Sequence, residues 1–239
     1  MHSLAYDSIH DEIVVNSPLA QAVLIFRGGA NGEEAPIRVI QGPRTEIQGT
    51  DYDGNDQMAF DEIHGEIYLP VAGNKILVFS REANGDVAPL RVLGGPDTQI
   101  RGTTRGHARV GVDPVHNLLV VTSSGERGSG GSMLIFDRTA SGNAKPKGVL
   151  QGPRTGIGGG GAPHVYPDNG WIIGGCAGGS VCAWSINDSG DVPPRWKIPV
   201  QQIAGVAPSG IALDPAHKEV IITSGNRNRV MTFSWPEIF

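Results

Sequence analysis

Residues 51 to 103 decide the fold of this chain, and they read DYDGNDQMAFDEIHGEIYLPVAGNKILVFSREANGDVAPLRVLGGPDTQIRGT. The stretch holds four apolar runs of strand length, each bounded by Gly, Asn, Asp or Pro: Met58–Asp61, Glu66–Leu69, Ile76–Phe79 and Ala88–Leu93. No helical periodicity separates these runs. The stretch is therefore predicted to form four short antiparallel strands joined by tight turns.

The same pattern recurs along the whole chain at a period of about fifty residues. It divides the sequence into five units, which span residues 1–50, 51–103, 104–160, 161–206 and 207–239. The fifth unit ends after its third run. Four-stranded sheets repeated radially around a channel make a β-propeller, with the first strand of each blade at the channel and the fourth at the rim. We therefore predict a single all-β domain, a β-propeller of five four-stranded antiparallel blades whose last blade lacks its outer strand.

An aromatic residue closes the third strand of every unit. These residues are Phe26, Phe79, Phe136, Trp184 and Phe233. Because neighbouring blades cover both faces of each sheet, we expect all five aromatic side chains to be buried.

The repeat resembles that of NHL-type bacterial propellers, and the resemblance covers the whole chain. It is carried by a first strand that ends in Asp61, by the runs at 66–69 and 76–79, and by the motif Ala88-Pro-Leu-Arg-Val-Leu93. The Trp-Asp dipeptide of another propeller family is absent. NHL-like proteins include both enzymes and binding scaffolds, so the resemblance implies the architecture and leaves the activity open.

Charge and hydropathy exclude some classes of partner. With 19 basic and 24 acidic residues the net charge is −5, and no basic patch for nucleic acid is present. No run approaches the roughly 18 apolar residues of a membrane span. The N-terminus lacks the features of a signal peptide. We expect a soluble protein without nucleic-acid or membrane partners, cytoplasmic as the sequence stands and secreted or periplasmic if a leader has been removed.

The two cysteines, Cys176 and Cys182, flank a short turn. A cross-strand disulfide is conceivable, but the two positions are expected to lie diagonal rather than opposite in the hairpin. We therefore expect free, partly buried thiols.

Four of the seven histidines belong to the repeat. His10, His64, His116 and His217 each follow, by three residues, the Asp that ends a first strand. The Asp side chain can accept hydrogen bonds from the turn backbone, and His is enriched in left-handed conformations. These histidines are predicted to be turn residues, with the His itself in the left-handed position.

The other three histidines, His2, His107 and His164, stand outside the repeat. Each lies just before a first strand, which places it at one mouth of the channel. Three imidazoles that converge there would suit a divalent metal such as Zn²⁺ with an open position, and the arrangement resembles that of NHL-type amidating lyases.

The same mouth is expected to carry charged residues that contact a ligand. The candidates are Asp56, Arg105 and Arg127, from segments that differ from blade to blade. Two functions remain open. One is a non-catalytic binding or scaffold propeller with a small molecule or a protein at the channel mouth. The alternative is a metal-dependent lyase or hydrolase with a His-lined mouth.

Overall fold

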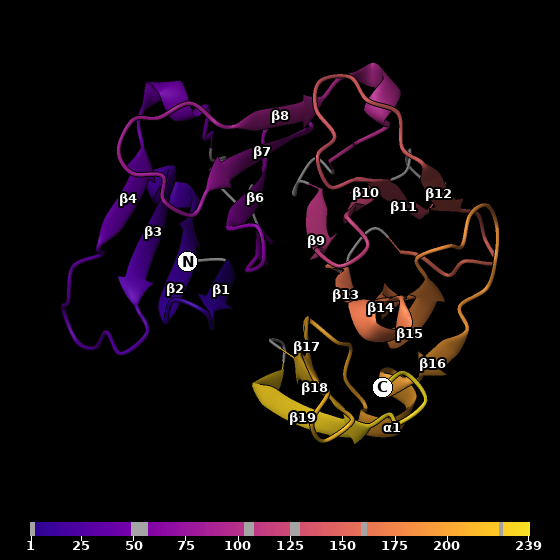
Figure 1. Cartoon of the computed structure of the whole chain (residues 1–239). Coiled ribbons are helices and arrows are strands. Elements are labelled where there is room, and N and C mark those ends of the chain that lie inside the picture. Colours follow the sequence, from indigo (N-terminus) through magenta and orange to yellow (C-terminus); the bar gives the residue numbers. More distant parts are fainter. Residues whose placement is uncertain (1–2, 49–56, 103–107, 125–129, 159–161, 225–226) are drawn as a thin grey trace.

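The computed structural model describes residues 3–48, 57–102, 108–124, 130–158, 162–224 and 227–239. Its strands form five antiparallel sheets around a central axis, four with four strands and the last with three. Figure 1 shows the sheets following one another in chain order around this axis. The predicted five-bladed propeller, with a last blade that lacks its outer strand, is confirmed.

The first three blades each contain four sequential strands. Blade 1 consists of β1 (Ser3–Asp7), β2 (Glu12–Ser17), β3 (Ala22–Arg27) and β4 (Arg38–Gln41). Blade 2 consists of β5 (Ala59–Asp61), β6 (Glu66–Val71), β7 (Lys75–Ser80) and β8 (Arg91–Gly94). Blade 3 consists of β9 (Arg109–Asp113), β10 (Leu118–Ser124), β11 (Gly131–Asp137) and β12 (Gly148–Gln151).

The last two blades follow the same order. Blade 4 consists of β13 (His164–Tyr166), β14 (Trp171–Cys176), β15 (Ser180–Ser185) and β16 (Trp196–Ile198). Blade 5 consists of β17 (Gly210–Asp214), β18 (Glu219–Ser224) and β19 (Arg229–Ser234). The helices are short: α1 (Val200–Ala204) and the 3₁₀ turns η1 (Pro18–Ala20), η2 (Pro43–Thr45), η3 (Pro96–Thr98) and η4 (Pro167–Asn169). None of the described helices is long and apolar enough to cross a membrane.

Proline shortens several strands relative to the sequence-based boundaries. The fourth strands begin at Arg38 and Arg91, each two residues after a proline, because proline has no N–H to donate to a ladder. In blade 4 the first strand ends at Tyr166, and Pro167 starts a 3₁₀ turn in its place.

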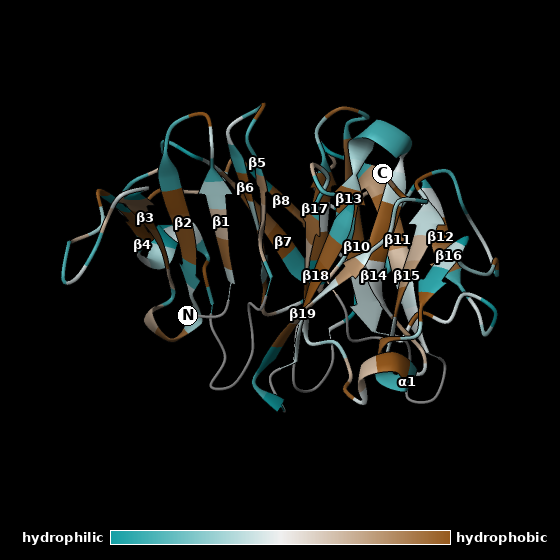
Figure 2. Ribbon diagram, turned by 90° about the horizontal axis from the view of Figure 1, so that it is seen from below, coloured by the Kyte–Doolittle hydropathy of each residue, from teal (hydrophilic) through white to brown (hydrophobic). Residues whose placement is uncertain are grey.

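Hydrophobic packing between consecutive blades holds the molecule together. Four clusters of buried side chains join blades 1 and 2, 2 and 3, 3 and 4, and 4 and 5. In blade 2, Ile67, Leu77 and Phe79 face blade 1, whereas Tyr68 and Ile76 face blade 3. Figure 2 shows the resulting hydrophobic strand centres between hydrophilic loops. A blade of this kind has no polar face.

The expectation of five buried aromatic residues holds for three of them. Phe79, Phe136 and Trp184 are at most 1% exposed, but Phe26 and Phe233 are only partly buried. Phe26 lies on the face of blade 1 that points away from blade 2, and none of the four clusters combines described residues of blades 1 and 5. The prediction was wrong for Phe26 because no described sheet packs on that face.

Buried ion pairs also join the first three blades, in addition to the hydrophobic clusters. Glu12 accepts hydrogen bonds from Arg38 of its own blade at 2.5 Å and from Arg81 of blade 2 at 2.9 Å. In the next junction Glu66 is held by Arg91 and by Arg138 of blade 3. Arg81 and Arg138, each the residue after a third strand, thus tie their blade to the preceding one.

In the junction between blades 3 and 4, apolar residues replace these charged residues. Leu118 stands where the other blades have Glu12 and Glu66, and Ile186 of blade 4 stands where they have Arg81 and Arg138. Both side chains belong to the cluster between blades 3 and 4. An apolar pair of similar size can replace a buried ion pair without loss of stability.

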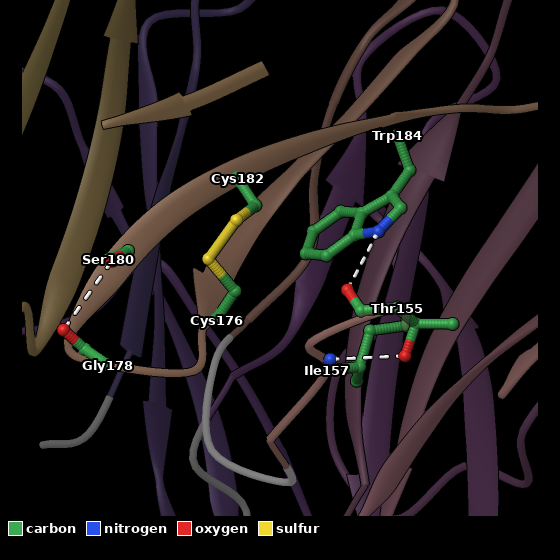
Figure 3. The surroundings of a disulfide bond; sticks show 7 residues. All are labelled: Thr155, Ile157, Cys176, Gly178, Ser180, Cys182 and Trp184. Carbon is green, nitrogen blue, oxygen red and sulfur yellow. Dashed lines mark hydrogen bonds between the residues drawn. A yellow bond between two sulfur atoms is a disulfide. The ribbon is translucent and has the colours of Figure 1, made fainter. Parts of the chain in front are cut away.

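Cys176 and Cys182 form a disulfide, so the expectation of free thiols was wrong. The residues are diagonal, as expected, because Cys176 pairs with Ser180 and Cys182 with Gly174. Their Cα atoms are nevertheless 5.9 Å apart, within the range that a disulfide spans, since the twist of a two-stranded ribbon shortens one of its diagonals. Figure 3 shows the bond on β14 and β15 near Trp184, whose indole N–H donates to the Thr155 carbonyl at 3.2 Å.

Phe79 and Phe26 occupy the same place in successive blades and provide a matched pair. Phe79→Ala is expected to lower the free energy of unfolding by about 3–5 kcal/mol, through lost burial and a cavity. Phe26→Ala should cost less than about 2 kcal/mol, because its ring is already partly in water. Urea unfolding of both variants measures the difference. Equal losses would show that another surface covers Phe26 in solution.

Loss of the disulfide is expected to destabilise the chain. The bond closes a loop with a sequence separation of 6. In the chain-entropy model a loop of this size corresponds to about 2 kcal/mol. The double variant Cys176→Ser, Cys182→Ser should unfold at a correspondingly lower urea concentration. Thiol titration of the unreduced wild type that found two reactive thiols would contradict the bond itself.

Candidate functional site

The Asp-x-x-His turns build one end of the molecule, and their structural role is confirmed. In each turn the His Nδ1 lies 2.8–2.9 Å from Oδ2 of the Asp, and the backbone N–H of the His donates to Oδ1. The residue with positive φ is not the His but its successor, namely Asp11, Gly65, Asn117 or Lys218. The carboxylate therefore holds the His in place, while the residue after the His adopts the left-handed conformation that the turn requires.

The first strands begin at the other end of the molecule, where a functional mouth was expected. The start of each first strand pairs with the end of the second strand, as Ser3 does with Asn16 and Arg109 with Thr122. The loops between second and third strands therefore lie at the same end as the chain entries to the first strands. This part of the sequence-based geometry is confirmed.

Of the six candidate site residues, only His164 lies within the described part of the chain. His2, Asp56, Arg105, His107 and Arg127 fall outside it. The described residues contain no group of three or more His, Cys, Asp or Glu side chains that could hold a metal ion. The convergence of the three histidines accordingly stays a prediction.

His164 is the first residue of β13, paired with Ile173, rather than a residue before the strand. Part of the residue is accessible, but its Nε2 atom is buried and has no hydrogen-bond partner among the described residues. Burial lowers the pKa of His164 to about 4. The ring is therefore neutral at physiological pH and presents a nitrogen whose hydrogen-bonding capacity is unused.

The central channel is a cavity of about 650 Å³ lined by all five first strands and the residues that precede them. Its apolar lining includes Leu4, Phe60, Val112, Val165 and Leu213. Tyr6, Gln57, Glu62 and His164 supply polar groups. A smaller cavity of about 20 Å³, enough for one water molecule, lies between His164, Gln57 and Ser209. His164 thus borders both spaces.

A second cluster with a shifted pKa belongs to blade packing. Burial would raise the pKa of Glu66, but the hydrogen bonds from Arg91 and Tyr68 outweigh it and lower the pKa. Burial and the contact with Glu66 raise the pKa of Tyr68. The related Glu12 cluster occupies the same position between blades 1 and 2. Structural ion pairs perturb pKa values as active sites do, so this cluster is not evidence for catalysis.

Comparison with known proteins identifies the fold alone. No protein-family model matches the chain, and no curated protein sequence does. A chain of the mitotic checkpoint complex superposes with a TM-score of 0.62 and 13% identity, over 100% of this chain and 61% of that one. The β-propeller domain of Cps50 (Swd1) from Myceliophteria thermophila gives 0.61 and 10%, over 98% and 64%. The present chain therefore spans less than two thirds of the length of each of these two structures. The NHL-type resemblance has no family match to confirm it.

His164 is expected to make the protein sensitive to acid. Because its folded-state pKa is about 4 and the ordinary value is 6.5, the unfolded chain binds a proton that the folded chain does not between these values. Stability is then lost as pH falls, by about 2–3 kcal/mol between about pH 7 and about pH 4.5. Urea unfolding of wild type and His164→Gln at both pH values measures this contribution.

The matched control for this experiment is His217→Gln. Asp214 raises the pKa of His217, so that residue stabilises the fold as pH falls and its removal should make the loss steeper. If the stability of His164→Gln fell with pH as much as that of wild type, the pKa of His164 would not be lowered in the folded state.

Proposed function

We propose that this chain is a non-catalytic binding propeller that holds a protein or small-molecule partner at the mouth of the channel where the first strands begin. The observation that carries the proposal is the cavity of about 650 Å³ to which every blade contributes. Ligand sites in proteins are concave and mostly apolar, with a few placed polar groups. The channel has this composition.

The lining indicates how a partner would be held. Apolar residues such as Leu4, Val112 and Leu213 suit an apolar side chain or ring that enters the channel. His164 and Gln57 offer polar groups beside it. We propose that Asp56, Arg105 and Arg127 supply charged contacts around the mouth. These three residues follow from the sequence pattern alone.

A protein partner is the preferred occupant. The mitotic checkpoint complex is a protein assembly, and one of its chains shares this architecture. Fold similarity at 13% identity does not transfer the partner, but it supports a propeller used for protein binding.

Selection of peptides on the immobilised chain tests the proposal. A selected peptide should bind wild type and the control variant Lys145→Ala equally, because Lys145 is exposed away from the channel lining. Leu4→Ala and His164→Ala should each weaken binding by at least about tenfold, as expected for central contacts near the start of the first strands. Asp56→Ala, Arg105→Ala and Arg127→Ala should have smaller effects. The readout is isothermal titration calorimetry.

Two results would contradict the proposal. One is a set of selected peptides that all bind Leu4→Ala and His164→Ala as tightly as wild type. The other is stoichiometric Zn²⁺ in equilibrium dialysis that His107→Ala and His164→Ala abolish but His116→Ala does not. The second result would favour the alternative function, a metal-dependent lyase or hydrolase that uses His2, His107 and His164.

The disulfide bears on the compartment. Disulfides persist in oxidising environments and are rare in the cytosol. The Cys176–Cys182 bond therefore supports the secreted or periplasmic alternative for this protein.

A further inference from the structure

A repeated contact at the rim docks the outer strand of one blade on a loop of the next. The loops that receive these strands contain Gly85, Gly142 and Gly190, and they form isolated parallel bridges with Ile40, Leu93 and Leu150. In each contact the Gly N–H donates to the carbonyl of the residue before the bridged Ile or Leu, at 2.6–2.7 Å. The Gly carbonyl accepts a hydrogen bond from the backbone N–H of the residue after the bridged Ile or Leu, at 2.9–3.2 Å. The contact occurs at three successive junctions.

The residue after each of these glycines adds a third anchor. Asp86 accepts a hydrogen bond from the backbone N–H of Arg44 at 2.7 Å, and Asn143 and Asp191 accept equivalent bonds. The anchored turns follow directly on the outer strands and begin with Gly42, Gly95 and Gly152, all with positive φ. A side chain at Gly42 would clash with Asp86, since an added Cβ would lie 2.5 Å from its carboxyl group. The contact therefore requires a glycine at this position, and the three docked segments share the pattern Val-(Ile/Leu)-x-Gly-Pro-x-Thr.

Blade 1 carries the same receiving loop. Asn31, Gly32 and Glu33 align with Asn84, Gly85 and Asp86. Gly32 has φ 61°, as Gly142 has, and an added side chain there would meet nothing within 4 Å. Glu33 is one methylene longer than Asp86 but keeps a carboxylate. Among the described residues, no hydrogen bond from another blade reaches this loop.

The surface beside the loop of blade 1 is apolar and incompletely covered. In blade 2 the equivalent surface is made by Leu77 and Phe79, which share a buried cluster with Ile40 of the docked strand. In blade 1 the corresponding residues are Leu24 and Phe26, with Val39 beside Leu24, and all three are only partly buried. Both the backbone groups and the apolar floor of a docking site are thus present.

We propose that Asn31–Glu33, together with Leu24, Phe26 and Val39, binds an extended segment of another polypeptide that carries the pattern Val-(Ile/Leu)-x-Gly-Pro-x-Thr. Within this sequence the pattern occurs at residues 39–45, 92–98 and 149–155. All three copies are already docked on blades 2, 3 and 4. A second copy of the chain has the same three segments in use, which argues against it as the source. Strand addition of this kind takes its affinity from main-chain hydrogen bonds and its specificity from the side chains between them.

A synthetic peptide with the sequence of residues 35–48 is the probe. Titrated into the ¹⁵N-labelled full chain at millimolar concentration, it should shift the amide resonance of Gly32 in a saturable way. The same peptide methylated on the backbone nitrogen of its Gln41 position loses the donor to the Gly carbonyl. It should bind about tenfold more weakly.

Matched variants separate this site from other surfaces. Gly32→Pro removes the N–H and the positive φ, and it should abolish binding without affecting the fold, because the loop is exposed. Lys145→Ala, in an equivalent loop of blade 3, should bind the peptide as wild type does. The proposal is overturned if Gly32 does not respond to the peptide, or if the shifts appear instead at Gly85, Gly142 and Gly190. It is also overturned if the Gly32 resonance shifts with protein concentration alone, which would identify a second copy as the occupant.

Discussion

The structure depends on the packing of one sheet face against the next. A blade whose two faces are both apolar is stable only when a sheet lies on each side, because the strands keep no polar face for water. Ile67 and Tyr68 are adjacent in sequence, point to opposite neighbours and are both fully buried. The four clusters between consecutive blades satisfy this requirement for the three central blades. The outward faces of blades 1 and 5 are the places where it is not satisfied by the described residues.

The two outward faces differ in chemistry, which limits what can cover them. Blade 1 presents apolar residues such as Leu24 and Phe26 next to a complete receiving loop. On blade 5 the outward face combines Thr223 and Thr232 with Val230, which is 71% exposed, and the described residues form no outer strand. Apolar groups on either face gain free energy from each covered methylene. Blade 1 differs because its apolar residues lie next to backbone groups that can pair with an added strand.

The sequence predicts the blades well because the same pattern of apolar runs and turns recurs five times. The alternation of short apolar runs with Gly-rich turns placed the strands, and Asp61 with His64 identified the turn between the first two. It could not predict the neighbours of a residue. Phe26 and Phe79 look equivalent in sequence, yet one is partly exposed and the other is 1% exposed, because burial depends on a sheet from another part of the chain. The Cys176–Cys182 bond was missed for a similar reason, since strand twist decides whether diagonal residues meet.

The candidate site was only partly predictable, and the reason is the distribution of constraint around the channel. At one end the Asp carboxylates, with Asp7, Asp61 and Asp113 at most 1% exposed, fix their turns by the same hydrogen bonds, so blades cannot vary there without loss of stability. At the other end, Thr45, Thr98 and Thr155 fix the turns after the outer strands by repeated hydrogen bonds, but among the described residues no such network repeats where the first strands begin. His164, with its buried and unpaired Nε2, appears in blade 4 alone at this position. A buried polar atom without a partner lowers stability, and packing of the repeat does not require one. The end of the channel that tolerates this cost in one blade is the end where a function specific to this protein can be placed.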